Sequence, residues 1–249
     1  MNKSLQTEAD LVPYRAESVL PARRVLVLAP HPDDEVFGCG ACTRLHVLAG
    51  ARVDVVVLTD GSGGGEPKVR EAESEAAARI LGTAAPHFWA YKDRELAHSF
   101  EASSNPLTQR LVQLLIEVGH EVVYAPSPWE VHPDHRATAR AVAQAVQELR
   151  SRGAELQWAA YEVGTPLWPS RLVNIDAVWA DKEAAMRCFM SQLSFQKYDE
   201  HISALNRYRS YTISGQCSMA EALWLPRNDD LAWVIQAWNE GKRHPGPTI

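Results

Sequence analysis

Short apolar runs rich in β-branched residues recur along this chain, and each is followed by a segment whose apolar positions have helical spacing. This alternation constrains the fold more than any other feature. Residues 23–30, "RRVLVLAP", and residues 52–60, "RVDVVVLTD", are two such runs. Continuous apolarity over this length is typical of strands buried on both faces in a parallel sheet. The pattern therefore predicts an α/β fold, a mostly parallel sheet with helices on both faces.

The alternation also gives the expected positions of the elements. We predict strands at residues 23–30, 52–60, 86–93, 121–128, 156–163 and 171–178. We predict helices at residues 40–50, 68–82, 106–119, 135–153, 180–189 and 198–211. Residues 1–22 are polar and are expected to form an arm over the surface, followed by a single domain over 23–249.

Composition excludes several classes of protein. The formal net charge of −6 and the lack of a basic stripe argue against a nucleic-acid binder. No apolar stretch is long enough to span a bilayer, and the start of the sequence lacks the pattern of a secretory signal. Four cysteines among 249 residues do not form a disulfide scaffold, so a reduced, cytoplasmic protein is expected. The sequence does not indicate an oligomeric state.

Three loops that follow predicted strands contain polar residues in unusual density. They are residues 30–35, "PHPDDE", residues 60–66, "DGSGGGE", and residues 126–135, "PSPWEVHPDH". In parallel sheets the carboxyl ends of the strands meet at one edge, and ligands bind outside that edge. We therefore expect the three loops to form one site.

Two of these loops contain the spacing of a metal site. His31 and Asp34 are separated by two residues, and His132 and His135 repeat this separation at the start of a later helix. A catalytic zinc ion usually takes three nitrogen or oxygen ligands and leaves a fourth position for water, which His31, Asp34 and His135 can satisfy. Asp33 is then available as a general base and His132 as the group that stabilises an oxyanion or protonates a leaving amine. Each motif alone could instead be a capped turn; together they predict metal-assisted hydrolysis of an amide or ester.

These residues resemble the two signatures of the LmbE-like, or PIG-L, family of zinc-dependent de-N-acetylases. The family carries a Pro/Ala-His-Pro-Asp-Asp-Glu motif and, past the middle, a His-Pro-Asp-His motif, here at residues 30–35 and 132–135. The resemblance extends from residue 23 to about residue 150 and includes "LTDGSGGG", "VREAESEAAARILG" and "YKDREL". Some members have a tyrosine two residues before the first histidine of the second motif, where this chain has Glu130.

The resemblance implies a Rossmann-like fold and a role for each matched position. His31, Asp34 and His135 would be the zinc ligands, Asp33 the general base and His132 the electrostatic partner of the oxyanion. Asp134 would orient a neighbouring histidine, and Arg70 and Asp93 would hold sugar hydroxyls. The implied activity is removal of the N-acetyl group from an N-acetylglucosamine-type conjugate. The cofactor would be Zn²⁺, and Fe²⁺ suits the same ligands.

Other features admit a structural interpretation beside a functional one. Residues 61–65, "GSGGG", lack the spacing of a dinucleotide fingerprint and are read as a rim of the pocket. Cys39 and Cys42 form a C-x-x-C pair that we expect to pack in the core. Trp129 could stack on a sugar face or be a buried structural residue. The alternatives to a sugar deacetylase are a hydrolase of a non-sugar N-acyl metabolite or glycopeptide, an inactive sugar-binding module and a nucleotide-binding regulator.

Overall fold

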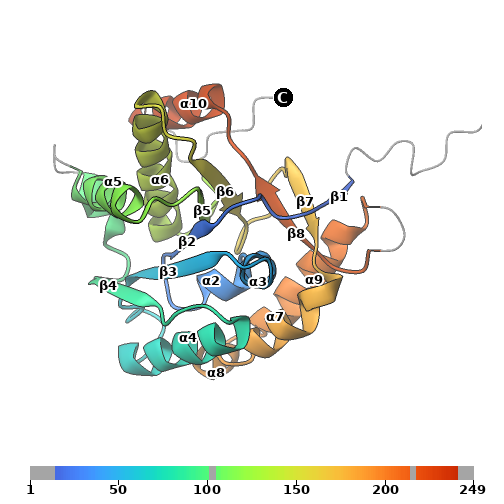
Figure 1. The fold of residues 1–249 in the computed structure, drawn as a ribbon. Helices are drawn as coiled ribbons and strands as arrows, with labels where there is room; N and C mark the ends of the chain where they lie inside the picture. Colours follow the sequence, from blue (N-terminus) through green and yellow to red (C-terminus); the bar gives the residue numbers. More distant parts are fainter. Residues whose placement is uncertain (1–14, 101–104, 214–216, 241–249) are drawn as a thin grey trace, which may run out of the picture.

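The computed structural model describes residues 15–100, 105–213 and 217–240, which form one α/β domain (Figure 1). Its strands are β1 Ala16–Glu17, β2 Arg24–Ala29, β3 Arg52–Thr59, β4 His87–Tyr91, β5 Val122–Pro126, β6 Gln157–Tyr161, β7 Arg171–Asn174 and β8 Ala220–Trp224. The helices are α2 Asp34–Phe37, α3 Gly40–Leu48, α4 Pro67–Leu81, α5 Pro106–Val118, α6 Pro133–Ser151, α7 Trp179–Met186, α8 Met190–Leu193, α9 Tyr198–Ser210 and α10 Asn228–Asn239. Short 3-10 turns cover Leu96–Phe100 and Asp176–Val178.

The strands form one open sheet in the order β1-β7-β8-β6-β5-β2-β3-β4. All neighbouring pairs are parallel except those of β8, which runs antiparallel to β6 and β7. The predicted fold class, a mostly parallel sheet in a single domain, is confirmed. From β2 the chain proceeds to β3 and β4 on one side and later returns to β5 on the other, so β2 and β5 flank a topological switch point.

Helices cover both faces of the sheet, because alternate residues of the buried strands point to opposite sides (Figure 1). On one face, Leu26, Leu28 and Val56 pack in the cluster that includes residues of α5, α6 and α10. On the other face, Val25, Val27 and Val55 pack in the cluster that includes residues of α3. The helices α4 and α7 contact each other on the α3 side.

The sequence pattern missed five of the strands and α-helices that the structure describes. These are the edge strand β1, the antiparallel strand β8, the short helices α2 and α8, and the helix α10. The predicted strand at 171–178 ends at Asn174. There the Asn174 side chain accepts a hydrogen bond from the backbone N–H of Asp176, which begins a 3-10 turn instead. Residues 1–14 of the predicted arm lie outside the described residues, and Ala16–Glu17 add to the sheet beside β7.

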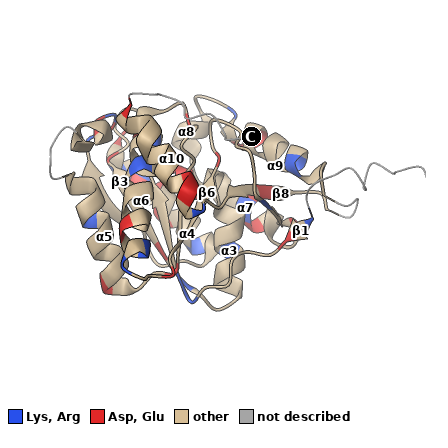
Figure 2. Ribbon diagram, turned by 90° about the horizontal axis from the view of Figure 1, so that it is seen from above, with Lys and Arg blue, Asp and Glu red and all other residues tan. Residues whose placement is uncertain are grey.

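Charged residues of both signs are interspersed along the helices (Figure 2). None of the described helices is both long and apolar enough to cross a membrane.

Candidate functional site

A cavity of about 540 Å³ opens at the carboxyl ends of β2, β3 and β5, beside the switch point. Its lining includes residues from all three polar loops, namely His31, Asp33, Asp34, Gly63, Gly64, Glu130, His132 and His135, and also Asp93 from the segment after β4. The carboxyl ends of parallel strands thus bring together residues that lie about a hundred positions apart in the sequence. A larger hollow, of about 1220 Å³, lies at the opposite edge of the sheet and is lined by other segments, among them residues 119–122 and 225–228.

Three ligand-type atoms form a small triangle at the cavity floor. The Nδ1 of His31 lies 3.2 Å from Asp34 Oδ2, the Nε2 of His135 lies 3.1 Å from the same oxygen, and the two nitrogens lie 3.3 Å apart. Zinc–nitrogen bonds of about 2.0–2.1 Å in a tetrahedral site place neighbouring ligand atoms about 3.3 Å apart. The triangle therefore has dimensions that fit a small divalent ion.

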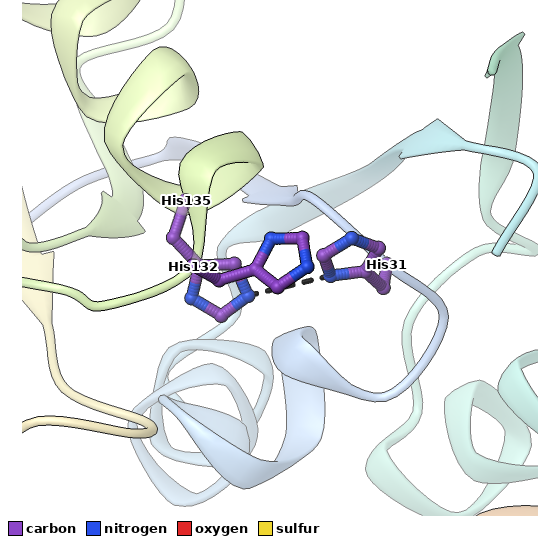
Figure 3. A group of neighbouring side chains, drawn as sticks. All are labelled: His31, His132 and His135. Atoms are coloured by element: carbon purple, nitrogen blue, oxygen red, sulfur yellow. Dashed lines mark hydrogen bonds between the residues drawn. The ribbon is translucent and has the colours of Figure 1, made fainter. Parts of the chain in front are cut away.

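His132 lies beside this triangle, and its ring is oriented by the backbone. Figure 3 shows His132 and His135 from the start of α6 facing His31 from the loop after β2. One nitrogen from each of His31, His132 and His135 lies within 4.8 Å of the others, so His132 is a second group that could face an ion. Its Nδ1 accepts a hydrogen bond of 3.2 Å from the Asp134 backbone N–H. The proton of a neutral His132 ring is then on Nε2, where it can be donated.

Carboxylates surround His31 on both sides of its ring. Its Nε2 lies 3.3 Å from Asp134 Oδ2 and 3.4 Å from Asp93 Oδ1. Burial alone would lower the pKa of His31, but the hydrogen bonds with Asp134, Asp34 and Asp93 outweigh it and raise that pKa well above its usual value. The site thus favours positive charge at its centre, as a cation-binding site must.

The other two members of the triangle are shifted in the same sense. Burial opposes the charge of His135, yet the neighbouring Asp34 charge dominates and raises the pKa of His135 to about 9. Burial likewise opposes the charge of Asp34, but its contacts with His135 and His31 hold the pKa of that carboxyl well below its usual range. Asp34 thus stabilises the charged form of each histidine, and the histidines stabilise the charged form of Asp34.

Asp33 occupies a strained backbone position at the start of α2. Its φ of 141° is in a region that L-residues rarely adopt, and such strain concentrates at functional sites. Its Oδ2 accepts a hydrogen bond of 2.9 Å from Arg70 Nη2. Burial, together with the nearby charge of Asp34, raises the pKa of Asp33 to about 8, although Arg70 opposes this. A carboxylate tuned toward neutral pH suits a general base.

Arg70 is held by the loops around it. Its Nη1 donates to Gly61 O and its Nη2 donates to Pro32 O, each at 2.8 Å, in addition to the contact with Asp33. A Cβ atom at Gly61 or Gly64 would lie within 2.8 Å of Nη1, so the glycines of the "GSGGG" segment allow the backbone to close around the guanidinium. These contacts favour a role in positioning Asp33, whereas the family resemblance implies a contact with sugar hydroxyls.

The two other predicted substrate contacts have different surroundings. Asp93 lines the cavity and accepts a hydrogen bond of 2.9 Å from Gly63 N–H. Trp129 is absent from the cavity lining, and its ring packs 4.8 Å from that of Trp224 beside the Leu167 cluster. The prediction that Trp129 stacks on a sugar finds no support in this position. The aromatic residues that line the cavity are Phe37 and Tyr198, whose rings stack 5.9 Å apart.

Glu130 is a site residue whose partners sequence reasoning missed. It is 1% exposed, and its Oε2 lies 3.4 Å from His135 Nδ1, on the side of the ring away from the triangle. Asp134, which was expected to orient a histidine, faces His31 and also accepts hydrogen bonds from the backbone N–H groups of Arg94 and Leu96. No local pattern identifies Glu130, because its remaining partners are residues 163–165.

Comparisons with known proteins agree with this geometry. The profile of PIG-L, described as GlcNAc-PI de-N-acetylase, matches residues 26–146. Diacetylchitobiose deacetylase of Thermococcus kodakarensis is 32% identical over 126 residues, which are 46% of this chain and 45% of that enzyme. A probable N-acetyl-alpha-D-glucosaminyl L-malate deacetylase 2 of Bacillus anthracis is 31% identical over 140 residues, 51% of this chain and 61% of that one. This chain thus spans about half to three fifths of the curated relatives it matches first.

A solved structure extends the similarity over most of the chain. N,N'-diacetylchitobiose deacetylase from Pyrococcus horikoshii is 25% identical with a TM-score of 0.72, covering 83% of this chain and 85% of that one. The matched fold, the family profile and the deacetylase relatives agree with one another.

Proposed function

Because this chain belongs to the PIG-L (LmbE-like) family, whose matched relatives are deacetylases, we propose that it is a metal-dependent hydrolase of N-acetylglucosamine-type conjugates. The observation that carries the proposal is the 3.1–3.3 Å triangle of His31, Asp34 and His135, with Asp33 and His132 beside it. The relatives named above are described as deacetylases of diacetylchitobiose and of an N-acetyl-glucosaminyl malate, which supports an N-acetylated sugar as the substrate class.

His31, Asp34 and His135 would hold the metal ion, Zn²⁺ or Fe²⁺, since imidazole and carboxylate suit both. When bound, such an ion lowers the pKa of a coordinated water to about 7 and polarises a carbonyl oxygen. Asp134 and Glu130 are the carboxylates behind the two histidines, and carboxylates in this position orient ligating rings.

Asp33 would take the proton of the water that attacks the acetyl carbonyl. Arg70 holds its Oδ2, so Oδ1 is the oxygen left to accept the proton. His132 would donate from Nε2 to the carbonyl oxygen as negative charge develops there. The proton held by Asp33 then passes to the sugar nitrogen while the carbon–nitrogen bond breaks, which gives acetate and a free amine. Asp93 would accept hydrogen bonds from sugar hydroxyls at the cavity wall.

The test is release of acetate by the purified protein reconstituted with Zn²⁺ or Fe²⁺. Diacetylchitobiose, N-acetyl-glucosaminyl malate and a panel of N-acetyl amines without a sugar would be compared. Turnover of the sugar substrates supports the proposal. Turnover of only the non-sugar amines would favour the alternative hydrolase, and no turnover of any substrate by the metal-loaded protein would contradict a deacetylase.

A further inference from the structure

Glu130 is buried between the candidate metal site and one wall of the cavity. Its Oε1 accepts hydrogen bonds from the backbone N–H groups of Val163, at 2.8 Å, and Thr165, at 3.4 Å. Its Oε2 accepts from Gly164 N–H at 3.1 Å and lies 3.4 Å from His135 Nδ1. A buried carboxylate is costly unless donors surround it, and here four nitrogens converge on its two oxygens.

This environment requires a group that only accepts hydrogen bonds. An ionised carboxylate meets that requirement, whereas a hydroxyl or an amide would turn a donor toward one of the N–H groups. Among the described residues, His135 Nδ1 is buried and makes no hydrogen bond, and Glu130 Oε2, at 3.4 Å, is the carboxylate oxygen beside it. The acceptor opposite it places the ring proton on Nδ1. The lone pair of a neutral ring is then on Nε2, the atom that faces Asp34 and His31.

We infer that Glu130 is a positioning residue that fixes the tautomer and orientation of His135 for the metal. Through its hydrogen bonds with the backbone N–H groups of residues 163–165, it also links that segment to the His135 ring. The inference rests on the proposed metal site. It also gives a role to the glutamate that this chain has where some family members have a tyrosine. Although Glu130 belongs to the cavity lining, it is 1% exposed and its two oxygens face backbone N–H groups and His135, so we assign it a role that acts through His135.

Glu162, which directly precedes residues 163–165, offers a matched control. Glu162 is 3% exposed, accepts a hydrogen bond of 2.8 Å from Leu167 N–H and pairs with Arg209 on α9. It anchors the segment that follows β6, as Glu130 does, but none of its described contacts is with His135. Replacing Glu162 therefore loosens the segment without changing the acceptor behind the histidine.

The experiment compares wild-type protein, Glu130→Gln and Glu162→Gln. Each is stripped with a chelator, and its affinity for Zn²⁺ is measured by competition with a chelating dye, with circular dichroism to confirm the fold. Loss of a carboxylate behind a ligating histidine typically weakens metal affinity about 10–100-fold. We expect a loss of this size for Glu130→Gln, and for Glu162→Gln a lower melting temperature with wild-type affinity.

Two results would overturn the inference: wild-type affinity in Glu130→Gln, or an equal loss of affinity in both variants, which would make the segment the cause. If Glu130→Gln does not fold, Glu130→Asp replaces it. The shorter aspartate side chain cannot reach His135 and the backbone N–H groups together, so this variant should also bind Zn²⁺ more weakly. Unchanged Zn²⁺ affinity in Glu130→Asp would contradict the inference.

The readout separates this inference from the proposed function. A protein that releases acetate but binds Zn²⁺ equally well with and without Glu130 would refute the inference alone. A protein whose Zn²⁺ affinity depends on Glu130 but that deacetylates nothing would refute the function alone.

Discussion

The protein buries two clusters of charged groups, and they differ in how completely their charges are paired. Beneath α2 and α3, Lys182 donates to Glu221 Oε1 at 2.7 Å, to Asn206 Oδ1 at 2.9 Å and to Phe37 O at 3.1 Å. Glu221 also accepts from the first backbone N–H groups of α3. One positive charge meets one negative charge, both side chains are fully buried, and each of the three ammonium protons has an acceptor.

The cluster at the cavity is paired differently. Asp33, Asp34 and Asp93 all line it, together with Arg70 as a buried cation and histidines whose charge depends on their protonation. The pKa of Asp33 rises to about 8 by burial and by the charge of Asp34, while the pKa of Asp34 falls. A cluster that contains its own counter-charge stabilises the fold, whereas a cluster with excess carboxylate has room for an external cation.

The largest effect is expected from Asp33→Asn, which breaks the cavity cluster at its proposed base. An amide keeps the shape of the side chain but cannot accept the proton of a water. General bases contribute about 10²–10⁴-fold to rate, so kcat for acetate release should fall by that factor. Metal content and melting temperature should stay near wild type. Substantial turnover by this variant would remove Asp33 from the role of base.

The second-largest effect is expected from Lys182→Met, which breaks the internally paired cluster of Lys182 and Glu221. Removing one partner leaves the charge of Glu221 buried without compensation, which typically costs about 3–5 kcal/mol of the free energy of unfolding. Urea denaturation would measure this loss, and the metal content per folded chain should not change. Glu221→Gln added to Lys182→Met should recover part of the stability. A single variant as stable as wild type would show that the pair is not structural.

A buried imidazole outside both clusters gives the third prediction. His46 Nε2 lies 3.0 Å from the hydroxyl of Tyr124, and burial lowers the pKa of His46 to about 4. The unfolded chain, with an ordinary pKa near 6.5, takes up this proton first as the pH falls. Stability that is present above about pH 6.5 is therefore lost toward pH 4, by about 2 kcal/mol between pH 7 and pH 5.

The variant His46→Gln tests this contribution of His46 to the pH dependence of stability, because glutamine keeps a hydrogen-bonding group and cannot titrate. Its free energy of unfolding should change less than that of wild type between pH 7 and pH 5. Identical pH slopes for the two proteins would mean that His46 does not contribute to the acid sensitivity.

The smallest effect concerns backbone strain at the cavity. Arg94 lines the cavity with a φ of 69°, a conformation that costs a non-glycine residue about 1 kcal/mol or more. In Arg94→Gly the backbone strain is relieved, but the unfolded chain gains conformational entropy because glycine is more flexible. The two effects offset each other, so the free energy of unfolding should change by less than about 1 kcal/mol. The same substitution at Arg79, in the last turn of α4, where the φ is not positive, should cost up to about 1 kcal/mol. A larger loss at Arg94 than at Arg79 would contradict the strain argument.

The sequence predicts the βα framework and the two histidine motifs because both are local. A buried strand or an amphipathic helix is encoded in consecutive residues, and a motif after a strand lies at the sheet edge by topology. The antiparallel strand β8 was missed because its sequence, "AEALW", contains Glu221, whose partner Lys182 lies 39 residues earlier. Pairing between such distant residues leaves no periodic signal.

The sequence also did not predict the direction in which individual side chains point. Trp129 follows a strand toward the site, yet its ring packs against Trp224. Arg70 has the spacing of a surface ion pair with Glu73, yet it is 3% exposed and contacts Asp33. Glu130 contacts backbone groups 33–35 residues later in the chain. These placements depend on tertiary packing, which composition and spacing do not encode.

The central claim is that the cavity cluster binds a metal ion through His31, Asp34 and His135. The most direct test is elemental mass spectrometry of wild-type protein and Asp34→Ala, purified identically. We expect about one zinc or iron ion per wild-type chain, as for a three-ligand catalytic site, and loss of that ion in the variant. No metal in the wild type after reconstitution, or equal metal in both proteins, would contradict it.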